Sequence, residues 1–127
     1  MTKLTKWSIE EMLENFVLNG FIISDDERFL AGTFVITSMI DTVEVDEANK
    51  AFIFHTMSGS EYLCSFEDIR ISARFAEFSK DNLERMNVFS FVVDEAIKLA
   101  HEKESYLVTK LESELLSGDL YLSLIHI

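Results

Sequence analysis

Carboxylates are the most abundant side chains in this sequence that could take part in catalysis or bind a partner. The 127 residues include 23 Asp and Glu against 11 Lys and Arg, so the formal net charge is −12 at pH 7. Two carboxylates can hydrolyse a glycoside when they face each other across a sugar-sized cleft. No spacing in this chain distinguishes one such pair from the others, and we therefore predict no catalytic pair.

The other reactive residue types are few. His55 falls within an expected strand and His101 on an expected helix, and neither has a Cys or a second His at metal-ligand spacing. The single cysteine, Cys64, lies in an alternating apolar stretch and is expected to be buried. The four glycines are isolated, so the sequence contains no phosphate-binding loop. We expect no catalytic residue, no metal site and no cofactor, and hence a protein that is not an enzyme.

The negative charge is concentrated in the first half of the chain. Residues 7–69 hold thirteen acids and two bases, whereas residues 70–127 hold ten acids and seven bases. A surface of this charge disfavours nucleic acids and anionic membranes as direct partners and attracts basic proteins. We therefore predict a contact surface for a basic partner. Its candidate residues are Glu10, Glu14, Asp25, Asp26, Glu27, Glu44, Asp46, Glu47 and Glu61.

Two other interpretations stay open. In one, the protein binds or sequesters a small nucleotide signal in a pocket between the sheet and the long helix. Arginine side chains suit phosphate groups, and the candidate contacts are His55, Arg70, Arg74 and Arg85. In the other, the acidity serves only solubility, and the chain is an α+β domain without a dedicated acidic contact surface.

The first element that the sequence predicts is a helix over residues 8–19. Ser8 and Glu11 have the spacing of a capping box, and Trp7 could pack onto Met12. An apolar face at helical spacing then includes Ile9, Met12, Leu13, Phe16 and Val17. Asn19-Gly20 is a typical helix end.

The middle of the chain predicts strands. After a short strand at residues 21–23 and an acidic loop at residues 24–27, residues 29–66 are rich in β-branched and aromatic side chains that alternate with polar ones. Turns are expected at residues 47–49 and 58–60, where Gly59 is free to adopt a positive φ.

Helices are expected in the last third. Ser79 or Asp81 could begin a long helix, and Ser105 could open a second one that ends at Gly118, unless the two are continuous. The predicted fold is therefore α+β: an N-terminal helix, an antiparallel β-meander of three or four strands, and C-terminal helices packed on one face. Eleven Phe predict an aromatic core, and the length predicts a single domain over residues 1–121.

The last six residues, 122–127 (Leu-Ser-Leu-Ile-His-Ile), resemble the in-frame translation of a transposon end used to prepare sequencing libraries. The resemblance implies a non-native tail and a metagenomic source. His126 then has no role in any mechanism.

A second resemblance lies in the expected strands. Thr37-Ser38-Met39-Ile40 and the later segment 56–63 (TMSGSEYL) resemble a "TS-x-I" strand end and a "T-x-SGS-x-Y-x-L" hairpin of small β-rich proteins from phages and mobile elements. With the acidic surface, this resemblance implies an anti-CRISPR-type inhibitor. Its carboxylates would mimic nucleic acid and block a basic nucleic-acid-binding surface, such as that of a CRISPR effector. Such a protein would act in the cytoplasm of a bacterial host, and its Phe-rich helices would permit a homodimer.

Overall fold

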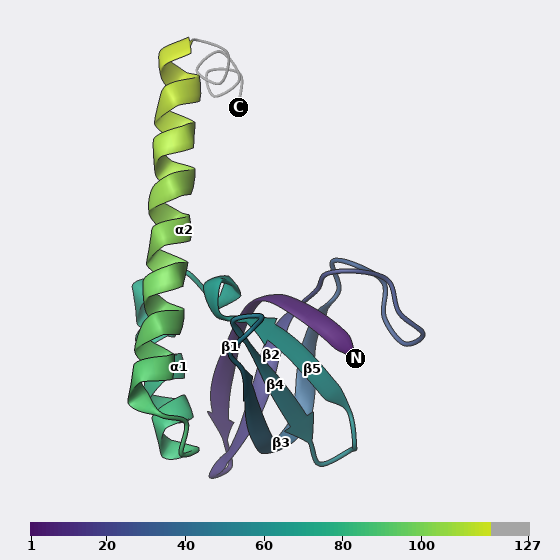
Figure 1. The fold of residues 1–127 in the computed structure, drawn as a ribbon. Helices are drawn as coiled ribbons and strands as arrows, with labels where there is room; N and C mark the ends of the chain where they lie inside the picture. Colours follow the sequence, from purple (N-terminus) through teal and green to yellow (C-terminus); the bar gives the residue numbers. More distant parts are fainter. Residues whose placement is uncertain (118–127) are drawn as a thin grey trace.

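The computed structural model describes residues 1–117 and forms a closed five-stranded barrel with two helices on one side (Figure 1). The α+β class is confirmed, but the strands come first and the meander has five of them. The strands are β1 Thr2–Met12, β2 Asn15–Ile22, β3 Phe34–Asp46, β4 Ala51–Thr56 and β5 Glu61–Ser65. A 3₁₀ turn, η1 Phe66–Asp68, leads to α1 Ala73–Arg85 and α2 Ser90–Ser117.

Closure of the barrel depends on the first strand. Each strand pairs antiparallel with the next, and β5 pairs parallel with β1 through Thr2↔Tyr62 and Leu4↔Cys64. An odd number of strands in a closed meander requires one parallel pair, because the first and last strands run in the same direction. The N-terminal residues are therefore part of the barrel wall.

The predicted N-terminal helix is wrong, because residues 2–22 form the hairpin β1–β2. The connection is a two-residue turn in which Leu13 and Glu14 both have positive φ (50° and 66°), the condition of a type I′ hairpin turn. This turn sets Ile9 opposite Leu18, and both side chains are fully buried. As a helix, this segment would lose the burial of these side chains in the barrel.

A bulge in β1 bends the strand between its two partners. The pairing with β2 changes register between Thr5 and Ser8, and Lys6 has a φ of 50°. Gly20 of β2 lies opposite the bulge, where an added Cβ would stand 3.3 Å from the Leu4 Cβ and from the Trp7 Cα. Gly20 is therefore a close-approach residue within a strand, and not the helix end that the sequence suggested.

The strands and turns expected over residues 29–66 are largely confirmed as β3, β4 and β5. Their turns lie at residues 47–50 and 57–59. Gly59 has a φ of 88°, as its position in a tight turn suggested. The residues of β4 and β5 alternate between the barrel interior and its outer surface.

The two helices divide at a point that the sequence did not identify. Ser79 lies inside α1, which begins at Ala73, so neither Ser79 nor Asp81 starts a helix. The break follows α1, where Asn87 has a φ of 64° and the Val88 N–H donates to the Leu83 carbonyl at 3.0 Å. Asparagine is one of the few residues that adopt this left-handed conformation readily. This conformation and the bond between Val88 and Leu83 end the helix.

The second helix, α2, continues through Ser105 without interruption, so no helix begins there. The break at Asn87 also interrupts the single continuous helix from Ser79 or Asp81 that the sequence allowed as the alternative. The first half of α2 packs on the barrel through Val93, Ala96 and Ala100, which are buried. Its second half projects beyond the barrel (Figure 1). The expected helix end at Gly118 and the suspected tail at residues 122–127 lie outside the described residues.

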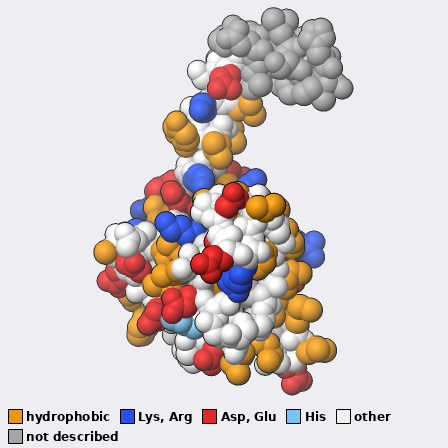
Figure 2. Space-filling view, turned by 90° about the vertical axis from the view of Figure 1, so that its right-hand side faces the viewer, with side chains coloured by type: hydrophobic (Ala, Val, Ile, Leu, Met, Phe, Trp, Pro, Cys, Tyr) orange, Lys and Arg blue, Asp and Glu red, His pale blue; other side chains and the backbone are white. Residues whose placement is uncertain are grey.

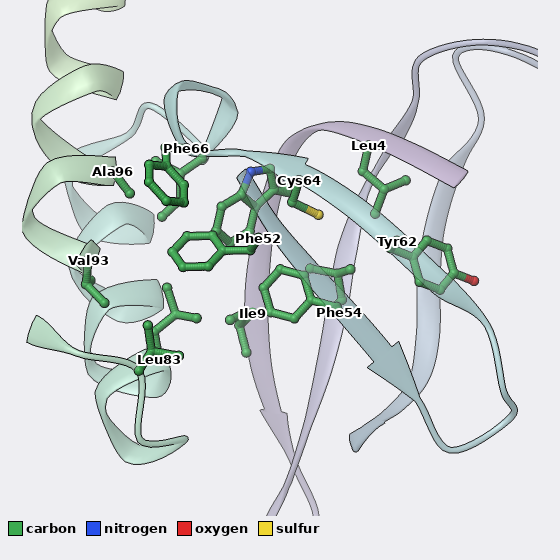
Figure 3. Packing of buried hydrophobic residues seen from close by; sticks show 14 of the residues in the cluster. Leu4, Ile9, Phe52, Phe54, Tyr62, Cys64, Phe66, Leu83, Val93 and Ala96 are labelled. Carbon is green, nitrogen blue, oxygen red and sulfur yellow. The ribbon is translucent and has the colours of Figure 1, made fainter. Parts of the chain in front are cut away.

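One core fills the barrel and extends to the helices (Figure 3). The Trp7 ring lies edge-on to Phe52 and Phe54, at centroid distances of 5.6 Å and 5.5 Å, and its indole N–H donates to the Ser65 carbonyl at 2.8 Å. Phe66 of η1 continues this cluster toward α2. Apolar side chains thus occupy the space between the barrel and the long helix.

Cys64 is part of this core, as predicted. Its side chain is fully buried on β5, and burial raises the pKa of its thiol well above the usual value. The thiol is therefore protonated at neutral pH, and a protonated thiol is a poor nucleophile.

Helix α1 covers an open edge of β1. Beyond Leu4 this edge has no further pairing with β5, and Ile9 presents its N–H and carbonyl to the helix. The Ile9 N–H donates to Ser79 Oγ at 3.4 Å, and the Asn82 side-chain amide donates to the Ile9 carbonyl at 3.1 Å. Both helix residues are buried. Two polar side chains of α1 thus take the place of a neighbouring strand.

Candidate functional site

The strongest candidate site is an acidic surface on the barrel wall that β3, β4, β5 and the loop 23–33 form together. We call it the acidic face. It consists of Asp26, Glu27, Asp41, Glu44 and Glu61, together with His55 and Arg28. Glu61 connects its two parts, because it lies beside His55 and also lines a groove against the loop.

His55 is held between carboxylates from both neighbouring strands. It stands opposite Glu61 on β5 and opposite Thr42 on β3. Its Nε2 lies 2.8 Å from a Glu44 carboxylate oxygen, and its Nδ1 lies 3.6 Å from a Glu61 oxygen. The hydrogen bond with Glu44 is the main cause that raises the pKa of His55, and the charges of Glu61 and Asp41 act in the same direction. His55 therefore carries a positive charge at a higher pH than an isolated histidine.

The groove beside Glu61 has a volume of about 570 Å³ and is lined by Met1, Thr2, Asp26, Glu27, Arg28 and Glu61. Asp26 fixes the loop, since it accepts hydrogen bonds from Thr2 Oγ1 and from the backbone N–H groups of Arg28 and Phe29, each at 2.8 Å. These bonds, that from Thr2 first, lower the pKa of Asp26. The Arg28 side chain donates to Ser60 Oγ at 2.8 Å, so the loop is joined to the turn before β5.

The acids of this face are only partly neutralised: His55 pairs with Glu44 and Glu61, and the charge of Arg28 acts on Asp26. Within residues 1–117, none of the five has a Lys or Arg side chain at ion-pairing distance. The Lys and Arg ion pairs join the helices to their neighbours instead: Lys50–Glu95, Lys80–Asp94, Arg85–Glu11 and Lys103–Asp68. Figure 2 views the molecule from the side opposite the helices and shows acidic side chains beside a histidine.

The structure brings four of the nine predicted contact residues to the acidic face: Asp26, Glu27, Glu44 and Glu61. The other five have separate places. Glu10 accepts a hydrogen bond from the Asn19 amide at 2.7 Å, and Glu14 lies in the β1–β2 turn. Asp25 accepts from the Ala31 N–H, and Asp46 accepts from Asn49, beside Glu47 in the β3–β4 turn.

Sequence reasoning missed Asp41 as a member of this face. Asp41 acts on the charge of His55, although the two residues lie on different strands. Because the pairing of β3 with β4 changes register between Ile40 and Thr42, strand alternation alone would not have placed it. The only signal for its membership in the sequence was that Asp41 lies in the expected strand before the one that contains His55.

The four residues of the ligand-binding interpretation do not form one site in the structure. His55 contacts carboxylates on β3 and β5. Arg70 donates to Asn19 Oδ1 at 2.8 Å and lies over the Phe75 ring, whereas Arg85 pairs with Glu11 at 2.6 Å. Arg74 is exposed at the start of α1. The described residues show no contact between any two of these four.

This arrangement can bind positively charged groups of a partner, and His55 can gain or lose one proton. Within residues 1–117, no group of three or more His, Cys, Asp or Glu side chains has the geometry to hold a metal ion.

Neither helix in the described part of the chain combines the length and apolar character that a membrane crossing requires. No protein-family model matches the sequence, and the comparisons with curated proteins and with solved structures also find no match.

Proposed function

We propose that this protein acts by binding, as a small acidic interaction protein whose acidic face blocks a basic nucleic-acid-binding surface of its target. The observation that carries the proposal is the set of five carboxylates on this face, none of which has a Lys or Arg side chain at ion-pairing distance within residues 1–117. Carboxylates in such a set can occupy the positions that phosphates take in a basic channel, and their field steers a basic partner from a distance.

The rigidity of the face supports this role. Asp26 and Arg28 fix the loop against β1 and the β4–β5 turn, and Glu44 is held by His55 on the barrel wall. A contact surface that is already ordered loses less conformational entropy when it binds. The target class comes from the sequence resemblance to small proteins of phages and mobile elements, which implies a CRISPR effector and an anti-defence function.

The test is to measure binding to a CRISPR nuclease by calorimetry and displacement of labelled DNA from the nuclease by fluorescence anisotropy. We expect affinity to fall steeply between about 0.05 and 0.3 M salt, because the interaction joins exposed charges. The diagnostic variant combines Glu27→Gln, Asp41→Asn and Glu61→Gln. Its three positions leave the bonds of Asp26 that hold the loop intact.

A loss of about 0.5–1 kcal/mol for each exposed charge predicts affinity weaker by about 10- to 100-fold. The matched control combines Glu77→Gln, Glu102→Gln and Glu112→Gln, which removes the same charge from exposed positions on α1 and α2. We expect it to weaken binding less than about threefold, through net charge alone. Equal losses in the two variants, or an affinity that does not respond to salt, would refute the proposal.

A further inference from the structure

Within residues 1–117, His55 is the only basic side chain that lies at ion-pairing distance of a carboxylate of the acidic face. The other ion pairs of this part of the chain join residues outside the face. Lysine and arginine keep their charge through the physiological pH range, whereas histidine loses its charge near neutral pH. His55 is therefore a counter-ion that a change of pH can remove.

The His55 ring meets a carboxylate at each of its nitrogens. Nε2 lies 2.8 Å from a Glu44 oxygen, and Nδ1 lies 3.6 Å from a Glu61 oxygen. The charged ring has an N–H at both nitrogens, whereas the neutral ring has one N–H and one lone pair. When the short bond to Glu44 keeps the remaining N–H, the lone pair stands at Nδ1. Loss of the proton then leaves Glu61 beside a second acceptor in place of a cation.

We infer that His55 is an exchangeable counter-ion: a basic group of the partner takes its place at Glu44 and Glu61, and the proton of His55 passes to the solvent. The inference rests on the function proposed above and concerns the regulation of the same site, because the acidic face then binds more tightly when His55 is neutral. The side chains of Glu44 and Glu61 are open to the partner, at 63% and 49% exposed. A guanidinium can donate both to a carboxylate and to the lone pair at Nδ1, which the charged ring does not offer.

The groups that face His55 determine the direction of the effect. They are Glu44 and Asp41 on β3 and Glu61 on β5, and all three are acidic. The hydrogen bond with Glu44 is the largest cause that raises the pKa of His55 in the free protein. A cation bound among these acids opposes their effect, so the pKa of His55 falls on binding. Affinity is then highest above the free-state pKa and declines as pH falls through it, by at most about tenfold per pH unit because one proton is exchanged.

The test is the binding of a labelled oligoarginine peptide of about six residues, whose charge does not change with pH. Fluorescence anisotropy measures its affinity for the full chain at about pH 5.5 and about pH 8.5, at constant salt. We expect affinity about 5- to 10-fold tighter at the higher pH, because two positive charges about 5 Å apart repel by this amount. NMR titration of the His55 ring should show a lower pKa with the peptide bound than without it.

Two variants assign the pH dependence to His55. His55→Gln keeps a polar side chain that does not titrate, and its affinity should change less than about twofold between the two pH values, because carboxylates stay charged at both. The matched control combines His101→Gln and His126→Gln, which removes the other two histidines, and it should keep the full pH dependence. His101 lies on α2 beside Glu104, outside the acidic face.

The remaining groups are constant in this comparison. Met1 lines the groove of the acidic face, and its amino group is the same in every variant, so it does not account for a difference between them. Fluorescence of the buried Trp7 checks that each variant is folded at both pH values.

The outcomes separate this inference from the proposed function. Peptide binding with the same pH dependence in His55→Gln and in the unchanged chain refutes the inference and leaves the proposed function standing. A pKa of His55 that does not fall when the peptide binds refutes it too, as does a peptide that binds at neither pH. If the peptide shows the expected dependence and the nuclease is not bound, the inference holds and the proposed target class is wrong.

Discussion

Replacement of Asn82 by alanine tests how the barrel edge is closed. The Asn82 side chain is 2% exposed, and its amide donates to the Ile9 carbonyl at 3.1 Å. The neighbouring N–H of Ile9 uses Ser79 of the same helix, so both backbone groups of Ile9 point to α1 and away from β2. Asn82→Ala removes the donor and leaves a buried carbonyl without this partner. We expect a loss of about 2 kcal/mol in the free energy of unfolding, within a range of about 1–3.

Urea unfolding followed by the fluorescence of Trp7 measures this loss. With a slope of about 1–3 kcal/mol/M, the midpoint should fall by about 1 M and the slope should stay unchanged. Ser79→Ala should lose less, because its bond to Ile9 is longer, at 3.4 Å. Asp81→Ala, at an exposed position on the same helix, is the control and should change stability by less than about 0.5 kcal/mol. A loss below about 0.5 kcal/mol for Asn82→Ala would show that these bonds do not hold the edge.

Three further predictions concern His55, Asn87 and Cys64. The raised pKa of His55 means that its charged form stabilises the folded state fully below about pH 6.5, and that this contribution disappears as pH rises through the folded-state pKa. His55→Gln should therefore lose more stability at pH 5.5 than at pH 8.5 in urea unfolding, and a pH-independent loss would contradict this. Asn87→Gly should be neutral within about 0.5 kcal/mol, whereas Asn87→Val should lose about 1–2 kcal/mol because of its positive φ, as thermal unfolding would measure. The Cys64 thiol should react with a thiol reagent only as fast as the protein unfolds, and rapid reaction of the native protein would argue against its burial.

The strands from residue 34 onward could be predicted because local and tertiary preferences agree there. Phe52 and Phe54 alternate with polar or half-buried residues on β4, and the turn at Gly59 has the residue type that its conformation requires. Burial of Cys64 followed from the same alternation. In these segments the local side-chain pattern favours the same strands that packing in the barrel requires.

The N-terminal hairpin could not be predicted because its turn is formed by Leu13 and Glu14, neither of which is typical of positive φ. Ser8 and Glu11 also matched a helix cap by coincidence. In the structure Ser8 donates to Asn19 at 3.0 Å, and Glu11 binds Arg85. Contacts between distant residues decided the outcome against a strong local signal.

The acidic face was predictable only in part for a related reason. The sequence showed that residues 7–69 are acidic, but it did not show which acids serve turns and which stand on the barrel wall. Asp25 and Asp46 accept hydrogen bonds within their own loops, whereas Glu44 and Glu61 meet at His55 only through the strand register. The sequence determines how many acidic residues this segment contains, and the fold determines which of them lie together on one surface.

The parallel pair that closes the barrel has a consequence for how the chain acquires its structure. Trp7 and Ser65, which are joined by a hydrogen bond, stand 58 positions apart, and Thr2 pairs with Tyr62. The two ends of this long segment must pair before the barrel around the core is closed. Folds dominated by such distant contacts form slowly, in about milliseconds to seconds. During synthesis, β1 would leave the ribosome long before β5 exists to pair with it. The first strands therefore pass through a period with open edges and exposed apolar side chains, when a chaperone would have the most to protect.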